Sequence, residues 1–173
     1  MRTLQKFSWL GLFLLIAMSA FAVPGKWRAA TEKELASLLP ARAPVEKEQI
    51  ETDLRTASGI TNSKGKFFAA VVIITAGYAA EGKYSYFLTM QSPIKMGDLT
   101  LQPGDYVFGQ RRVDETTIEV KFHEAASGKL VGTLKAQRGE TRGAIRSILI
   151  APPKGGTGSF SLGRFVFPYT ISE

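Results

Sequence analysis

The side chains that could perform chemistry are few and scattered along this chain. His123 is the single histidine, and the sequence contains no cysteine. These counts exclude a multi-histidine metal site, thiolate zinc and iron–sulfur sites, and a cysteine nucleophile. A serine triad would depend on one residue. His123 stands on the polar side of an alternating stretch, so we predict an exposed surface histidine without a catalytic role.

A glycine-rich stretch covers Lys154-Gly155-Gly156-Thr157-Gly158-Ser159. A phosphate-binding loop needs two glycines that bracket four residues, followed by Lys, then Ser or Thr, and a helix. In this chain the lysine precedes the glycines and a strand pattern follows. The stretch therefore predicts a connection between two strands.

The acidic residues form no paired motif. Glu115 and Glu119 stand at strand spacing, whereas Asp98 and Asp105 flank a predicted hairpin. Carboxylates from different strands can face each other as they do in glycosidases, so a carboxylate-based hydrolase stays an alternative function. These residues predict no catalytic group, no metal ligand and no cofactor.

Aromatic residues give the clearest binding signal. Tyr84 and Tyr86 share a face of one predicted strand, and Tyr106 and Phe108 share a face of another. On neighbouring strands these rings would form a platform that stacks on a sugar or a peptide. The alternative is that they fill the interior. Tyr78, in the glycine-flanked loop 77–82, is a further ligand-binding candidate.

The first 22 residues have the layout of a secretory signal. Arg2 and Lys6 give a positive start, an apolar run follows over residues 9–18, and Ala20-Phe21-Ala22 has the small residues of a cleavage site. We predict cleavage after Ala22 and export to the periplasm or beyond, with an uncleaved anchor as the alternative. No later stretch is long enough to span a membrane.

Residues 23–48 predict an N-terminal extension with one short helix. Thr31 and Glu34 form a capping-box pattern, and Leu35, Leu38 and Leu39 make one apolar stripe. Pro40 ends the helix. Pro40 and Pro44 then favour an extended connector.

From residue 49 onward the hydrophobic period changes to two. We expect residues 49–173 to form one all-β domain, an antiparallel β-sandwich or small barrel. The run 67–75 (FFAAVVIIT) predicts a central strand buried on both faces. Turn chemistry at Pro103-Gly104-Asp105 predicts a hairpin between flanking strands. The expected strands cover residues 50–56, 67–75, 83–90, 99–101, 106–113, 117–123, 129–137, 144–151 and 160–171.

Residues 94–108 carry a recognisable succession of turns and strands through Gly97, Leu101, Pro103, Gly104 and Tyr106. The stretch resembles a segment of uncharacterised exported bacterial β-sandwich domains. The resemblance implies a β-sandwich fold and export, and it implies no catalytic residue.

The formal net charge is +7, and the basic residues are spread along the chain without a block of like charges. This distribution is typical of a solvated surface and predicts no nucleic-acid partner. The sequence thus predicts an exported, non-catalytic module that has a binding or structural role toward a glycan, a peptide or an envelope protein. A small-barrel carrier of an apolar ligand is a second alternative, and no oligomeric state is predicted.

Overall fold

The computed structural model describes residues 26–80, 82–140 and 143–172. The predicted signal peptide and cleavage site lie outside the described residues. Within these ranges, no helix has the length and apolar character needed to cross a membrane.

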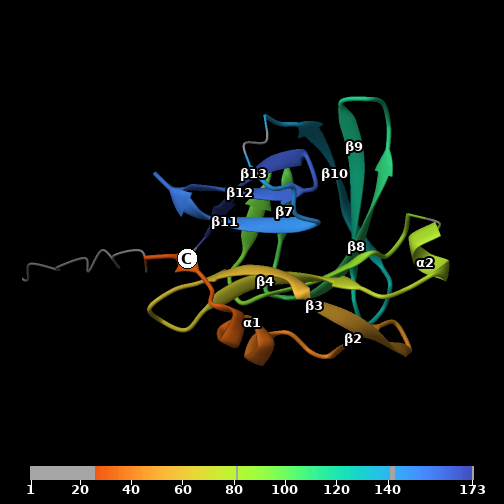
Figure 1. The fold of residues 1–173 in the computed structure, drawn as a ribbon, viewed down its shortest axis with the longest axis horizontal. Coiled ribbons are helices and arrows are strands. Elements are labelled where there is room, and N and C mark those ends of the chain that lie inside the picture. The colour runs from red at the N-terminus through yellow and green to blue at the C-terminus, as the bar shows by residue number, and fades with distance from the viewer. Residues whose placement is uncertain (1–25, 81, 141–142, 173) are drawn as a thin grey trace, which may run out of the picture.

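Strands dominate the described chain (Figure 1), and two short helices accompany them. The helices are α1 (Glu32–Leu38) and α2 (Gly77–Ala80). The strands are β1 (Arg28–Ala29), β2 (Arg42–Val45), β3 (Glu48–Thr61), β4 (Phe67–Ile73), β5 (Tyr86–Met90), β6 (Ile94–Met96), β7 (Leu99–Leu101), β8 (Gly104–Arg112), β9 (Thr117–Glu124), β10 (Leu130–Arg138), β11 (Ile148–Lys154), β12 (Thr157–Leu162) and β13 (Phe165–Ile171).

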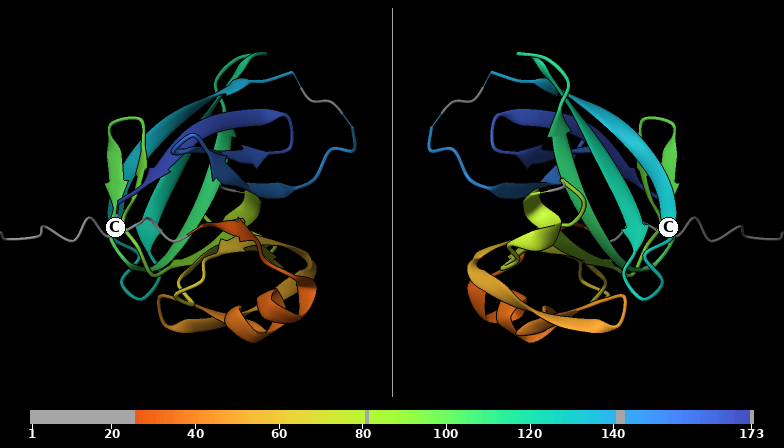
Figure 2. Two further views of the ribbon diagram at one scale, coloured as in Figure 1. Left: turned by 90° about the vertical axis from the view of Figure 1, so that its left-hand side faces the viewer. Right: turned by 90° about the vertical axis from the view of Figure 1, so that its right-hand side faces the viewer.

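The sheet curls into a nearly closed antiparallel barrel. Its strand order is β1-β3-β4-β5-β8-β9-β10-β13-β12-β11, and β11 at the end of this order comes back beside β3. Figure 2 shows the curved wall, with α1 and β2 stacked outside it. The predicted all-β fold with a minor N-terminal helix is confirmed.

The barrel interior is filled by apolar side chains from most of its strands. Phe108 is central to it, since its ring stacks at 4.8 Å on Tyr86 and at 5.0 Å on Phe122 and meets the edge of Phe160 at 5.8 Å. All four residues are buried. Because successive strand residues point to opposite faces, the other side of β4 is free to build a second core.

The second core lies between the outer face of the sheet and the N-terminal layer. Leu35 of α1, Leu39 just after it and Val45 of β2 pack there with Val71 of β4, and all are buried. The predicted central strand is therefore confirmed over β4, which is buried on both faces, but it is two residues shorter than predicted, since β4 ends at Ile73 and Ile74 is 59% exposed. The capping box at Thr31 is also present, since its hydroxyl accepts a hydrogen bond from the Glu34 amide.

The hairpin predicted around Gly104 is wrong. β7 pairs with β6 across the Gly97–Asp98 turn, whereas β8 pairs with β5 and β9. Turn chemistry is local, and it does not determine which strand lies alongside after the turn. Two smaller differences accompany it. The predicted connector after Pro40 contains β2, and the stretch 160–171 is divided into β12 and β13.

Candidate functional site

The edge of β3 that faces away from β4 is uncovered over its middle. β2 pairs with Glu48–Glu51, and β1 pairs with Ile60–Thr61. Between these partners, residues 54–58 are not paired with any strand on that edge within the described chain. Such an edge presents backbone groups that another extended chain can bind.

The same part of β3 is irregular on its paired side. The register with β4 shifts between Asp53 and Ser58, so this stretch bulges. Thr56 holds the bulge, because its hydroxyl accepts from the Val72 amide at 3.0 Å and donates to the Asp53 carbonyl at 2.7 Å. The bulge ends the inward alternation, and Leu54 is left 37% exposed.

β11 supplies a second free edge opposite. Within the described residues β11 pairs with β12 alone. One hydrogen bond joins β11 to β3 in the described chain, from the Ile150 amide to the Ser58 hydroxyl oxygen at 2.8 Å. A side chain thus takes the place that a strand carbonyl would occupy in a closed barrel.

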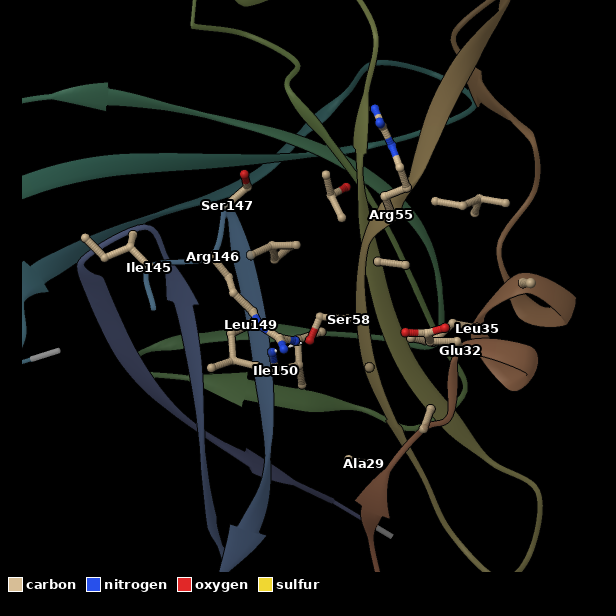
Figure 3. A pocket seen from close by; sticks show the side chains of 17 residues that line it. Ala29, Glu32, Leu35, Arg55, Ser58, Ile145, Arg146, Ser147, Leu149 and Ile150 are labelled. Atoms are coloured by element: carbon tan, nitrogen blue, oxygen red, sulfur yellow. Dashed lines mark hydrogen bonds between the residues drawn. The ribbon is translucent and has the colours of Figure 1, made fainter. Parts of the chain in front are cut away.

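Between these edges lies a groove of about 820 Å³, which we call the β3–β11 groove. Figure 3 shows its two walls, with β11 and the residues before it on one side and β3 with α1 on the other. Exposed apolar side chains line it, namely Leu54, Ile145 and Leu149 at 37%, 50% and 37% exposure. The groove therefore combines apolar surface with free strand edges.

Three charged side chains also line the groove, and they differ in their partners. Arg55 forms an ion pair with Asp53, Nε to Oδ1 at 2.9 Å, and this pair holds the pKa of Asp53 below its usual value. Figure 3 shows Arg55 directed away from Ser58. Arg146, in contrast, has no hydrogen bond or ion pair within the described residues, and Figure 3 shows it extending into the groove toward Ser58.

Glu32 lines the opposite wall, on the first turn of α1. That wall is held in place by Arg28 of β1, whose guanidinium binds the Glu34 carboxylate at 2.6 Å. This contact and the capping bond from Thr31 lower the pKa of Glu34 to about 2. The groove thus carries Glu32 and the paired Arg55 on its β3–α1 wall, and the unpaired Arg146 on the opposite wall.

A second polar group of residues, which we call the Glu46 cluster, consists of Glu46, Tyr78, Lys83, Tyr84 and His123. It lies where the β2–β3 turn meets the residues before β5 and the end of β9. Glu46 Oε1 accepts from the Tyr84 hydroxyl at 2.7 Å and from Lys83 Nζ at 3.2 Å. The His123 ring meets the edge of Tyr84 at 5.2 Å, and Tyr78 lies 5.0 Å from Tyr84.

Hydrogen bonds and burial shift the pKa values of two residues in this cluster. The hydrogen bond from Tyr84, followed by that from Lys83, lowers the pKa of Glu46. Burial lowers the pKa of His123, and the nearby Lys83 and Lys121 lower it further. Tyr84 and His123 are 0% and 8% exposed, so we interpret the cluster as a structural connection between three turns.

The prediction that His123 is an exposed surface residue is therefore wrong. Strand alternation places His123 on the outer face of β9, as expected, but residues 83–84 form a further layer over that face. Its Nδ1 atom is buried without a hydrogen-bond partner in the described chain.

The five predicted ligand-binding residues separate into two places. Tyr86, Tyr106 and Phe108 lie in the inner core at 7%, 6% and 0% exposure, so they form no exposed platform. Tyr84 and Tyr78 belong to the Glu46 cluster, on the other side of the sheet. None of the five lines the β3–β11 groove.

Sequence reasoning missed the groove because its walls are distant in the chain. Ser58 and Ile150 are 92 residues apart, and no local pattern joins them. The sequence does contain one weak signal of an irregular strand near Leu54. The alternation of apolar and polar residues continues through Leu54, but Gly59, which follows Ser58 inside the same strand, is typical of a bulge or of a close approach between backbones.

Comparison of the chain with protein-family models, with curated proteins and with solved structures finds no match. The resemblance noted for residues 94–108 thus stays a prediction.

Proposed function

We propose that this protein is an exported, non-catalytic binding module whose β3–β11 groove holds a segment of a partner protein. The observation that carries the proposal is the pair of free strand edges that face each other across a groove lined by exposed apolar side chains. Free edges and alternating apolar pockets are the two features by which folded domains bind extended polypeptides.

The alternative functions have less support. A carrier of an apolar ligand would need space inside the barrel, but the stacked rings of Tyr86, Phe108 and Phe122 occupy the interior. A carboxylate-based hydrolase would need two acids that face each other in one cleft, and Glu32 is the single acidic residue among the described residues that line the groove. Glu48 and Glu51 line another surface hollow, but they are three positions apart on β3 and so point to opposite faces of the strand. Glycan binding depended on an exposed aromatic platform, and those rings are buried.

Export is the second part of the proposal, and it rests on the signal pattern of residues 1–22. Intact-mass measurement of the protein from the exported fraction of its host should give a chain that begins at Val23. A chain that retains its first residues would contradict cleavage and favour the membrane anchor.

Site-specific cross-linking tests the binding role. The absence of cysteine allows a single photo-cross-linker to be attached at Ser147→Cys, which lies in the groove. The matched control is Ser172→Cys, an exposed serine outside the groove lining. We expect the groove variant to cross-link one polypeptide segment in the host, and the synthetic segment to bind the purified protein in calorimetry.

Equal cross-linking at both positions would overturn the proposal, as would a segment that fails to bind once synthesised. A cross-linked species that is not a polypeptide would redirect the function to another ligand class.

A further inference from the structure

We propose that the segment bound in the β3–β11 groove is an extended, acidic strand, which hydrogen-bonds along the free edge of β11 and places a carboxylate against Arg146. This inference rests on the proposed function, and it specifies the chemistry of the occupant and the residues that recognise it.

The backbone of β11 points the right way for strand addition. The N–H and C=O groups of successive strand residues alternate between the two edges of a strand. Since the Ile150 amide points across the groove to Ser58, the amide and carbonyl of Ile148 point into the groove as well. β11 has no strand partner on that edge in the described chain. An incoming strand can therefore continue the sheet beyond β11.

The position of the Ser58–Ile150 hydrogen bond determines where the strand enters. This bond joins the two walls directly, and so leaves no room for another backbone at that level. The open part of the groove extends from there toward Ile145, past Leu149 on one wall and Leu54 on the other. The segment thus lies between residues 145–149 and residues 54–57.

The exposed apolar residues predict an alternating sequence in the segment. Side chains of an extended strand point to opposite faces in turn. One set of positions would contact Leu54, Leu149 and Ile145, which otherwise expose apolar surface to water. The other set faces outward and can be polar.

Charge selects an acidic segment. Arg146 is the one cation of the described groove lining that lacks a partner, because Arg55 already binds Asp53. A guanidinium binds a carboxylate through two parallel hydrogen bonds, which adds geometric specificity. Glu32 on the α1 wall repels a carboxylate, so the acidic side chain is directed to the Arg146 side.

Selection from a random dodecapeptide library displayed on phage tests this inference on the purified mature protein. We expect enriched peptides with alternating apolar positions and an Asp or Glu at a constant position. Arg146→Gln should weaken their binding about tenfold, the effect of losing a charge-assisted hydrogen bond. The matched control Arg164→Gln, an exposed arginine outside the groove lining, should change affinity less than about twofold. Selection on Arg146→Glu should favour Lys or Arg at the same position.

Two further measurements test strand addition itself. The amides of a bound strand alternate between its two edges, and one edge alone meets β11. N-methylation of the set of alternate amides on that edge of a selected peptide should abolish binding, whereas N-methylation of the other set should leave binding intact. Hydrogen exchange at the Ile148 amide should slow when the peptide is bound.

The outcomes separate the two proposals. Enriched peptides without an acidic preference, or equal losses in the two arginine variants, would overturn the carboxylate contact and leave the binding function standing. If N-methylation of neither set of alternate amides weakened binding, strand addition would be overturned. If no peptide is enriched, the binding function itself is contradicted.

Discussion

Glu46 adopts a backbone φ of 56°, a left-handed conformation that is unfavourable for a residue with a side chain. Its contacts compensate for this strain. The Glu46 amide donates to the Ala125 carbonyl at 2.6 Å, and its carboxylate accepts from Tyr84 and Lys83. Gly128 contributes by lacking a side chain, because an added Cβ would contact the Glu46 carboxylate. The turn conformation is therefore maintained by groups from two other parts of the chain, residues 83–84 and the turn of residues 125–128.

Replacing Tyr84 by Phe should lower the free energy of unfolding by about 1 kcal/mol, because the substitution removes a hydrogen bond to a carboxylate and keeps the buried ring. Tyr78→Phe is the matched control, since the Tyr78 hydroxyl lies 3.5 Å from Glu48 and this contact is exposed. Urea denaturation followed by circular dichroism measures both variants. Equal effects in the two would show that the Tyr84 hydroxyl does not hold the cluster.

His123 should make the protein less stable in mild acid. Burial, assisted by Lys83 and Lys121, lowers the pKa of His123 in the folded state below its usual 6.5, while the nearby Glu46 opposes this effect. The unfolded chain therefore takes up a proton first as the pH falls below 6.5, and the free energy of unfolding decreases with it. Well above pH 6.5 both states are neutral at this residue, and its contribution does not vary with pH.

Urea midpoints at about pH 7.5 and about pH 5.5 measure this effect. The decrease should be larger in the original protein than in His123→Gln, whatever the substitution does to stability at neutral pH. An identical decrease in both proteins would assign the acid sensitivity to other groups, such as Glu46.

At the scale of elements, the strand β3 pairs with three other strands. β3 pairs with β2 near its start, with β1 near its end and with β4 over most of its length. Its bulge between Asp53 and Ser58 separates these regions and leaves the groove edge free. The Ser58 hydroxyl then joins β3 to β11. At the seam of the barrel, one buried side-chain hydrogen bond thus stands where a strand ladder would normally run, beside the packing of β11 on β3.

Ser58→Ala should leave the buried Ile150 amide without its acceptor and cost about 1–2 kcal/mol of unfolding free energy. Hydrogen exchange at Ile150 should become faster, because the edge of β11 is no longer held against β3. Ser161→Ala is the control, since this β12 serine makes no side-chain hydrogen bond in the described chain; its effect should be within about 0.5 kcal/mol. Unchanged exchange at Ile150 would mean that packing alone closes the barrel.

The elements that depend on local signals were predictable from the sequence. The capping box at Thr31 predicts α1, and the β-branched run of residues 67–75 predicts β4. Contacts between distant segments were not predictable in this way. The turn at Gly104 was recognised, but the partners of β8 depend on how the whole sheet assembles. The burial of His123 and the groove at Ser58 likewise depend on segments that no local pattern connects.

At the scale of the whole molecule, the two hydrophobic cores share the same strands. Along β4, Phe68 and Ala70 face the inner core, while Ala69 and Val71 face the outer one. A strand cannot move out of one core without disturbing the other. We therefore expect the inner barrel and the outer layer of α1 and β2 to unfold together.

Leu35→Ala tests this coupling from the outer core. Leu35 is 6% exposed, and removing its side chain from α1 should lower the free energy of unfolding by about 2–4 kcal/mol. Trp27, the single tryptophan of the described residues, packs against the inner core, so its fluorescence reports on the barrel. The thermal transition seen by Trp27 fluorescence and that seen by circular dichroism should shift down by the same amount, since both cores depend on β4.

Leu130→Ala is the control, at a leucine that is 51% exposed, and it should shift neither midpoint by more than a small fraction of this change. If Leu35→Ala lowered the circular dichroism midpoint while the Trp27 midpoint stayed in place, the N-terminal layer would be an independent unit, and the α1 wall of the groove could open without unfolding the barrel.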